Sequence, residues 1–314
     1  MSQQTDDSAL SELVLATVTR TRDEASLEPL RRALLESPHS HVLWRALGIG
    51  LAVIDRFNEA INALETALEH SPSDVLSLAY YGIALRCGGD LDCADSLFDF
   101  KGEILTSELD PGSSKTETQA FNDLLAKHIK QHPSIAWQPE EKATRNGYQT
   151  GELFPSSLPE LARLRRLLLI HVKEVIDKIA PETAADNIDS AFALTAWGVV
   201  LTSGGYQRPH VHPDGILSGV YYVSTPGMSR PKRDDMEVTL PGGALRFRRT
   251  LPWIGSPDSE NGTDVHVVVP KEGTVVIFPS FYWHDVSPYR LADERICIAF
   301  DVMPKSSLPN QLDQ

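Results

Sequence analysis

The first third of the chain repeats a pattern of large apolar and small residues with a period of about 34 residues. The matched positions form columns of similar residues, which are Leu10, Trp44 and Leu78; Leu13, Leu47 and Tyr81; Gly48 and Gly82; Leu51 and Leu85; Ser26, Ala60 and Ala94; Leu30, Leu64 and Phe98; and Ala33 and Ala67. Small residues are needed where two antiparallel helices cross closely, and large apolar residues fill the flanking turns. The pattern therefore predicts an α-solenoid of about three helix pairs over residues 1–113, in which each pair covers the apolar face of the next.

Residues 114–190 carry a helical pattern without this repeat. The turn-rich segment from Leu109 to Ser114 marks the boundary with the repeat region. One helix is predicted over Phe121–His132, where Pro133 ends it. A second is predicted over Leu158–Ile179, where apolar residues recur at helical spacing. We expect these helices to flank the domain that follows.

After Ser190 the period of the hydrophobic pattern changes to two. Runs rich in β-branched and aromatic residues predict strands at Ala193–Thr202, Leu217–Ser224, Ala244–Arg249, Val265–Val269, Thr274–Phe278 and Arg295–Val302. Short strands without intervening helices are typical of an antiparallel barrel such as a jelly roll. The chain is therefore predicted to be an α+β multidomain protein. Its second domain covers residues 114–314, with the barrel over residues 191–304.

Composition and charge narrow the classes of function. The 314 residues carry a formal net charge of −14, which disfavours phosphate backbones, so we expect no nucleic-acid partner. No apolar run is long enough for a membrane span, and residues 1–7 lack the basic and apolar parts of a leader. Cys87, Cys93 and Cys297 are too few and too irregularly spaced for a disulfide framework. We expect a cytoplasmic protein without a membrane partner, and the oligomeric state stays open.

Polar clusters lie at the ends of the predicted strands, and the mouth of a barrel commonly binds ligands. The clusters are Gly205–Asp214, Pro279–Val286 and Glu294–Arg295. Side chains two residues apart point to the same face of a strand. Two such faces carry polar groups, one with Arg295, Cys297 and Ala299 and the other with Ser218, Val220 and Tyr222. The small residues after Arg295 leave room for a ligand beside its guanidinium.

The repeats and the barrel clusters each resemble a known family. The repeats resemble tetratricopeptide repeats, and residues 44–72 match every position of their signature. The remainder resembles the Fe(II)/2-oxoglutarate-dependent oxygenase superfamily on its double-stranded β-helix fold, in particular the prolyl-hydroxylase-like branch from bacteria and phages. This resemblance is densest over Trp197–Asp301. The matching stretches are Gly205–His212, Leu217–Val223, Gly273–Ser280 and Arg295–Asp301.

The second resemblance implies a role for each cluster. His210 and His284 are then the histidine ligands of Fe(II), a metal that needs nitrogen and oxygen ligands on one face and open positions for 2-oxoglutarate and O2. Arg295 would bind the distal carboxylate of 2-oxoglutarate through a bidentate ion pair. Tyr222, on the same face as Ser218, would hydrogen-bond the same carboxylate. His210, His284 and Arg295 are thus the predicted catalytic residues, and Arg295, Tyr222 and Ser218 the predicted cosubstrate site.

The third iron ligand stays open between two residues. The superfamily motif is His-x-Asp or His-x-Glu, followed much later by the second histidine. An alignment on Gly205–His210 puts His212 where the carboxylate is expected. A shift of two residues instead gives His212-Pro213-Asp214, which reads His-x-Asp, although Pro213 favours a turn there. We therefore keep both His212 and Asp214 as candidate metal ligands.

Taken together, the resemblances predict an Fe(II)- and 2-oxoglutarate-dependent dioxygenase. It would hydroxylate a protein or peptide that the concave face of the repeats recruits. Two alternatives stay open. One is a three-histidine metal dioxygenase that does not use 2-oxoglutarate, and the other is a repeat adaptor whose barrel is inactive. Arg295 separates the two enzymes, because only a dicarboxylate cosubstrate requires it.

Overall fold

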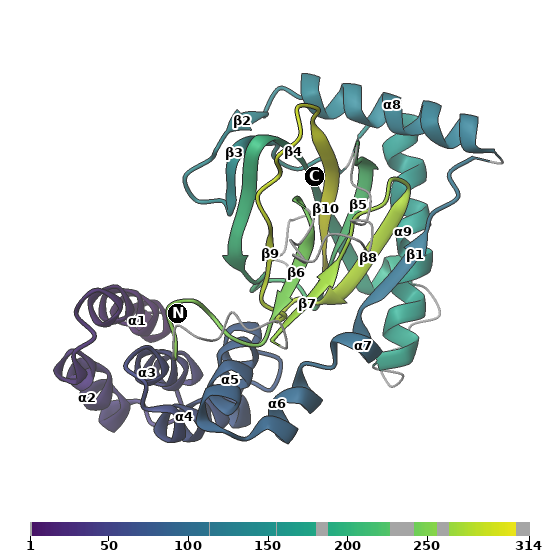
Figure 1. Cartoon of the computed structure of the whole chain (residues 1–314). Helices are drawn as coiled ribbons and strands as arrows, with labels where there is room; N and C mark the ends of the chain where they lie inside the picture. The colour runs from purple at the N-terminus through teal and green to yellow at the C-terminus, as the bar shows by residue number, and fades with distance from the viewer. Residues whose placement is uncertain are drawn as a thin grey trace. The chain divides into compact units, whose positions relative to one another are not determined.

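A computed structural model describes residues 2–112, 114–154, 156–179, 188–226, 242–255 and 264–305. Contacts within the chain divide it into two compact units (Figure 1). The helical unit consists of Met1–Asp99, Arg248–His266 and Phe281–Trp283, and the sheet unit of Phe100–Phe247, Val267–Ser280 and His284–Gln314. Ser113, at the predicted domain boundary, lies outside the described residues, and the boundary itself stays a prediction.

The described part of the helical unit contains three consecutive helix pairs (Figure 1). The pairs are α1 (Ser2–Thr21) with α2 (Glu28–Glu36), α3 (His41–Val53) with α4 (Phe57–His70), and α5 (Val75–Gly88) with α6 (Leu91–Leu97); the short 3-10 helix η1 (Glu24–Leu27) lies inside the first pair. Neighbouring helices pack on each other along this series, and α1 also contacts α3. Local sequence fixes the ends of α5, since Asp74 accepts a hydrogen bond from the Ser77 amide at its start and Gly89 adopts a left-handed φ of 96° after it.

The glycine column of the repeat lies where helices cross closely. A Cβ atom added to Gly48 would lie 2.5 Å from Leu64 Cγ, and one added to Gly82 would lie 2.4 Å from the Phe98 ring. These two contacts occupy equivalent positions of the repeat, and Ala60 of the small-residue column is fully buried. The small residues of the repeat pattern thus lie where neighbouring helices pack closely. The assignment to tetratricopeptide repeats stays a prediction.

The helical unit also includes a short segment from the sequence region of the barrel, Phe281–Trp283. The Trp283 indole Nε1 donates a hydrogen bond to the carbonyl oxygen of Ala79 in α5 at 3.1 Å. The Trp283 ring meets Tyr80 edge-on, with 5.2 Å between the ring centroids. Phe281 stacks on Phe98 at 6.2 Å. The segment that immediately precedes His284 is therefore held by aromatic packing and by the backbone of α5.

The sheet unit is built on a curled antiparallel sheet (Figure 1). Its strands are β1 (Leu105–Glu108), β2 (Ala136–Trp137), β3 (Thr144–Gln149), β4 (Phe192–His210), β5 (Leu217–Ser224), β6 (Leu245–Arg248), β7 (Val265–Val268), β8 (Thr274–Pro279), β9 (His284–Val286) and β10 (Arg295–Pro304). They run in the order β1-β8-β5-β10-β4-β9-β6-β7, and the β2–β3 hairpin adds to β4. The long β4 pairs with β10 through its first half and with β9 through Gln207 and His210. It therefore connects the two sides of the curled sheet.

Two long helices pack on the outer face of this sheet. They are α8 (Lys115–Gln131) and α9 (Pro159–Ile179), and the short helices α7 (Phe100–Glu103) and α10 (Ile188–Ala191) complete the described helices of the unit. The Ser114 hydroxyl begins α8 by accepting from the Glu117 amide, and α8 ends before Pro133. Apolar residues of both helices form one buried core with β4, β5, β8 and β10. Tyr221 adds a polar anchor, because its hydroxyl donates to Asn122 Oδ1 of α8 at 2.7 Å.

The predicted helices and strands are confirmed as elements, with differences in extent. Both lead-in helices form, and each of the six predicted strands appears within two residues of its predicted start. β4 continues eight residues beyond its predicted end, to His210. The prediction missed β1, β2, β3 and β9. β2 and β9 have only two and three residues, which is too few to show an alternating pattern. β9 contains the predicted ligand His284.

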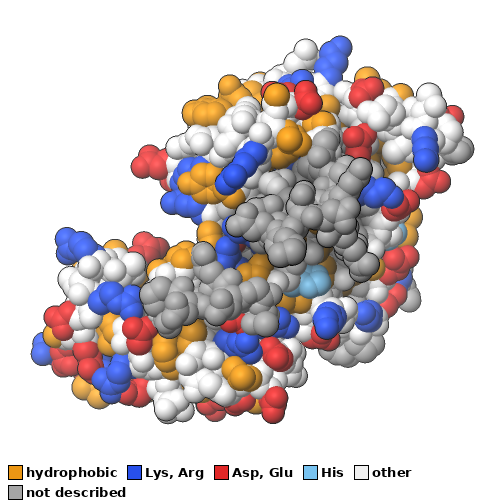
Figure 2. All heavy atoms as spheres, viewed as in Figure 1, with side chains coloured by type: hydrophobic (Ala, Val, Ile, Leu, Met, Phe, Trp, Pro, Cys, Tyr) orange, Lys and Arg blue, Asp and Glu red, His pale blue; other side chains and the backbone are white. Residues whose placement is uncertain are grey.

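The apolar length of the helices and the charges on the surface can be compared with the sequence. No helix among the described residues is long and apolar enough to cross a membrane. On the face drawn in Figure 2, basic and acidic side chains are interspersed. Acidic residues outnumber basic ones in the whole sequence, and on this face the two kinds are mixed.

We expect Gly82→Ala to lower the free energy of unfolding by about 1–3 kcal/mol, because the added methyl group overlaps the buried Phe98 ring. Gly88→Ala in the same helix is the control. Its nearest neighbour would lie 3.3 Å away, at the mobile end of Ile61, so stability should not fall. Urea denaturation followed by circular dichroism measures both variants. Equal stabilities of the two variants would contradict the close crossing of α5 and α6.

Candidate functional site

Two of the predicted site histidines face each other across paired strands. His210 ends β4 and lies directly opposite His284, the first residue of β9. The pairing shifts register between Gln207 and His210, and this irregularity brings His210 opposite His284. The centroids of the two rings lie 4.2 Å apart. The bulge in β4 thus sets the position of the pair.

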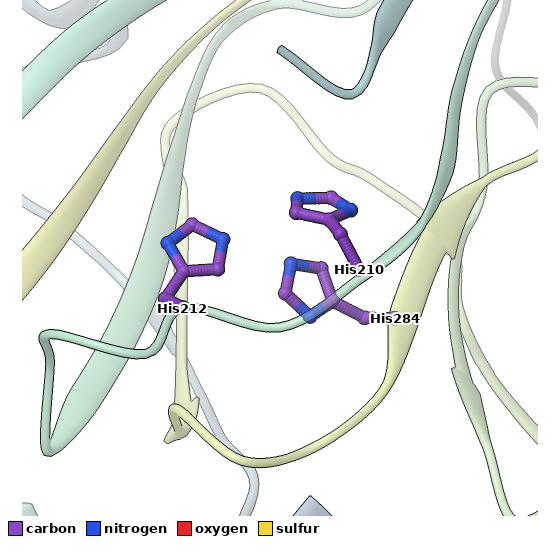
Figure 3. Close-up of side chains that lie close together, drawn as sticks. All are labelled: His210, His212 and His284. Atoms are coloured by element: carbon purple, nitrogen blue, oxygen red, sulfur yellow. The ribbon is translucent and has the colours of Figure 1, made fainter. Parts of the chain in front are cut away.

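His212 joins this pair from the turn that follows β4. Its ring centroid lies 5.1 Å from those of both His210 and His284. One nitrogen from each of the three rings falls within 4.8 Å of the others (Figure 3). The His212 ring also stacks on Trp197 of β4 at 5.6 Å. Imidazole nitrogens at this spacing form a donor set that suits iron and other transition metals.

Hydrogen bonds fix which nitrogen each of two histidines presents. His210 Nδ1 lies 2.7 Å from the Arg208 carbonyl oxygen, which can only accept, so Nδ1 carries the proton. His212 Nδ1 likewise donates to Asp301, at 2.7 Å from Oδ1. His212 Nε2 therefore keeps its lone pair, and it is buried without a hydrogen-bond partner. An orphaned buried nitrogen that faces two other imidazoles fits a bound metal ion.

Burial keeps His210 neutral. Burial and, to a smaller extent, the nearby His212 lower the pKa of His210 to about 3, whereas the bond to Arg208 opposes the shift. A neutral imidazole is the form that binds a metal, because protonation removes the lone pair. His210 is thus ready to act as a ligand at neutral pH.

Asp214, the other candidate for the third ligand, lies apart from this group. It lines an outer pocket, together with Glu141, Gln149 and Gln207. Within the described residues, the group of possible metal ligands consists of His210, His212 and His284. The structure therefore brings His212, and not Asp214, to the other two histidines.

Arg295 provides a buried positive charge near the histidines. Only 1% of its surface is exposed, and its Nε has no hydrogen-bond partner. Its Nη1 reaches Cys297 Sγ at 3.5 Å, and the guanidinium lies 5.1 Å from the centre of the Tyr222 ring. No carboxylate among the described residues forms an ion pair with it. A buried guanidinium without a counter-ion favours an anionic ligand.

Tyr222 adds a hydroxyl group beside this guanidinium. The hydroxyl is buried and has no hydrogen-bond partner. Burial raises the pKa of Tyr222 above its usual value, although Arg295 opposes the shift, so the group keeps its proton. It can therefore donate to the same anion that Arg295 attracts.

The histidines and the anion-binding groups line one cavity. Its wall includes His210, His212, His284, Ser218, Tyr222, Arg295, Cys297 and Ala299. The Ser218 hydroxyl lies within this wall, but it donates to Asp301 Oδ1 at 2.7 Å and lies 2.8 Å from the Ser280 hydroxyl. The cavity thus has a nitrogen-rich part and an anion-binding part, and Ser218 contacts Asp301 in its wall.

Sequence reasoning missed three residues of this site. Asp301 holds His212, Trp197 stacks on it, and Gln207 lines both the inner cavity and the outer pocket. Strand alternation contained a signal for Asp301, which lies an even number of residues after Arg295 and so on the same face of β10. Trp197 and Gln207 gave no comparable signal.

Comparisons with known proteins agree with this geometry. Residues 195–301 match the family described as "Putative 2OG-Fe(II) oxygenase". No curated protein matches the chain. The family match and the three-histidine group support Fe(II) and 2-oxoglutarate as cofactors.

Three of the solved structures that match the chain are described here. A prolyl-4-hydroxylase from Pseudomonas putida is 14% identical, with a TM-score of 0.43, over 66% of this chain and 95% of that one. HygX from Streptomyces hygroscopicus, solved with nickel and 2-oxoglutarate bound, is 12% identical, with a TM-score of 0.46, over 67% and 87%. A prolyl hydroxylase from Trichoplax adhaerens, in complex with a hypoxia inducible factor peptide, is 13% identical, with a TM-score of 0.44, over 66% and 86%.

We expect His212→Ala to weaken Co(II) binding by more than roughly 100-fold, because a direct ligand is removed. Loss of a residue that only orients a ligand typically costs about 10- to 100-fold. Asp214→Asn is the control, and it should bind Co(II) as the wild type does, since Asp214 lies outside the histidine group. Anaerobic titration followed by the visible spectrum of Co(II) measures both. The reverse result, with weak binding in Asp214→Asn alone, would identify the carboxylate as the ligand.

Proposed function

We propose that the protein is an Fe(II)- and 2-oxoglutarate-dependent dioxygenase that hydroxylates its substrate. One observation carries the proposal: a buried guanidinium and a buried tyrosine hydroxyl, both with unsatisfied hydrogen-bonding atoms, line the same cavity as three convergent imidazoles. A dicarboxylate with a keto group next to one end satisfies both halves of this cavity. The family match over residues 195–301 supports the same cosubstrate.

Each residue has a distinct task in this proposal. His210, His212 and His284 hold Fe(II), and Arg295 and Tyr222 hold the distal carboxylate of 2-oxoglutarate. When bound, iron and 2-oxoglutarate together supply the oxidising power, in which O2 converts 2-oxoglutarate to succinate and CO2 and leaves one oxygen atom for the substrate. The apolar side chains of Val220, Leu245 and Phe278 line the cavity and limit the access of water.

The outer pocket offers the substrate a route to the metal. His210 and His212 line both this pocket and the inner cavity, so a substrate in the outer pocket lies beside the metal ligands. The pocket wall is polar and includes Gln149, Gln207 and Asp214. We place the reacting group of the substrate here.

The helical unit is the proposed recruitment module. Its three helix pairs with a repeated crossing pattern support an assignment to tetratricopeptide repeats, whose concave faces bind peptides or proteins. A protein or peptide substrate follows from this assignment. The proposed cellular location is the cytoplasm.

We expect Arg295→Ala to weaken 2-oxoglutarate binding by roughly two orders of magnitude, because loss of one partner of a buried charge pair is worth about 2–5 kcal/mol. Tyr222→Phe should weaken it less, since one hydrogen bond to a charged group contributes about 1.5–3 kcal/mol. Anaerobic titration of the Fe(II) protein with 2-oxoglutarate, followed by the visible charge-transfer band, measures both. Arg290→Ala, on the exposed segment before β10, is the control.

The same titration separates the alternatives. Iron binding without any band from 2-oxoglutarate would favour a three-histidine dioxygenase that does not use this cosubstrate. Absence of iron binding in the wild type would favour an adaptor with an inactive barrel. Normal 2-oxoglutarate affinity in Arg295→Ala, with normal iron content and circular dichroism, would contradict the cosubstrate site.

We expect peptide or protein substrates to increase succinate formation by the full chain, because a bound substrate couples cosubstrate turnover to its own hydroxylation. Peptide pools are compared with free amino acids and simple sugars, and mass spectrometry locates any added oxygen atom. Stimulation by small molecules alone would contradict recruitment through the helical unit. It would leave the iron and 2-oxoglutarate assignments intact.

A further inference from the structure

Asp301 contacts the histidine group without belonging to it. It lies on β10, on the face that also carries Arg295, Cys297 and Ala299. Its Oδ1 and Oδ2 lie 2.7 and 3.0 Å from His212 Nδ1. Both side chains are largely buried, with exposed fractions of 12% for His212 and 14% for Asp301. The carboxylate is therefore paired with one ring nitrogen, and both side chains are mostly shielded from solvent.

We propose that Asp301 is a positioning residue that holds His212 as the third metal ligand and supplies the negative charge that a carboxylate ligand would provide. This inference rests on the metal site of the proposed function. The carboxylate accepts the Nδ1 proton of His212, so Nε2 presents its lone pair to the metal. Asp301 acts through His212 and does not itself bind the metal.

A network of contacts fixes both members of this pair. The Ser218 hydroxyl donates to Asp301 Oδ1 at 2.7 Å. The backbone amide of His212 donates to the Ser280 carbonyl oxygen at 3.1 Å, and Trp197 stacks on the His212 ring. Besides their contact with each other, the carboxylate is held by the Ser218 hydroxyl, and the imidazole is held by Trp197 and by the backbone bond to Ser280. The orientation of Nε2 toward His210 and His284 thus follows from several elements at once.

The pair of Asp301 and His212 also affects the net charge around the metal ion. Three neutral imidazoles leave a divalent ion with its full charge, whereas two imidazoles and a carboxylate reduce that charge by one unit. Asp301 supplies this one negative charge through its contact with His212, without binding the metal itself. The ion and its nearest protein charge then balance as they would in a site with two histidines and one carboxylate. Arg295 remains the positive group for the distal end of 2-oxoglutarate.

The test uses the full chain with Co(II) as the probe metal, so no substrate or turnover is needed. Asp301→Asn keeps the shape of the side chain and removes its charge, and Asp301→Ala removes the contact. We expect Co(II) affinity to fall about 10-fold in Asp301→Asn and about 100-fold in Asp301→Ala. Asp293→Asn, an exposed carboxylate ahead of β10, is the matched control and should bind as the wild type does.

A second measurement separates positioning from a loss of folding. Nitrogen NMR of the metal-free protein reports which ring nitrogen of His212 carries the proton. We expect the Nδ1-protonated form in the wild type and in Asp301→Asn, whose amide oxygen still accepts the bond. We expect a mixture of both forms in Asp301→Ala. Wild-type tautomer and wild-type Co(II) affinity in Asp301→Ala would overturn the proposal, and the isosteric Asn variant carries the test if the Ala variant does not fold.

His284→Ala distinguishes this inference from the proposed function. If His284→Ala binds no Co(II) while Asp301→Ala binds it normally, only the role of Asp301 is wrong. If His284→Ala also binds Co(II) normally, the metal site itself is wrong. Weak binding in both variants, together with the tautomer change, supports the inference and the site on which it rests.

Discussion

The alternation of side chains along β10 organises both the core and the candidate site. This strand pairs with β4 on one side and β5 on the other, in the middle of the sheet. One of its faces packs Ile296, Ile298, Phe300 and Val302 into the core beneath α8 and α9. The opposite face carries Arg295, Cys297, Ala299 and Asp301. A shift of one residue in register would exchange the two sets, so burial of the apolar face also fixes the direction of the charged one.

Close packing on the apolar side reinforces this register. A Cβ atom added to Gly219 of β5 would lie 2.2 Å from the Phe300 ring, so this glycine leaves the space that the ring fills. Gly198 of β4 gives the same room to Ile129 of α8, with a distance of 2.5 Å. Both neighbours of β10 therefore carry a glycine where a large residue approaches. The strands that hold Tyr222 and Trp197 are aligned by contacts on the face away from the cavity.

Much of this arrangement could be predicted from the sequence, because it depends on periods within single segments. The strand of Arg295, the face of Tyr222 and the helix-crossing glycines all follow from spacing two or 34 residues apart. The choice between His212 and Asp214 could not be made in this way, since Pro213 lies in a turn where alternation no longer applies. Alternation places Asp301 on the same face as Arg295, but its bond to His212 could not be predicted, because the two residues are distant in sequence.

The position of His284 depends on a further constraint that the period of β9 could not reveal. The residue before it, Trp283, belongs to the helical unit, where the indole bonds to the Ala79 carbonyl oxygen and packs on Tyr80. The residue itself is fixed by its pairing with His210 and by the Phe278 ring at 4.8 Å. A three-residue strand has little pairing of its own, so the pairing with His210 and the contact with Phe278 position the imidazole within the sheet unit. The aromatic contacts of Trp283 lie in the helical unit and those of His284 lie in the sheet unit, so no pattern within β9 itself could predict the position of the imidazole.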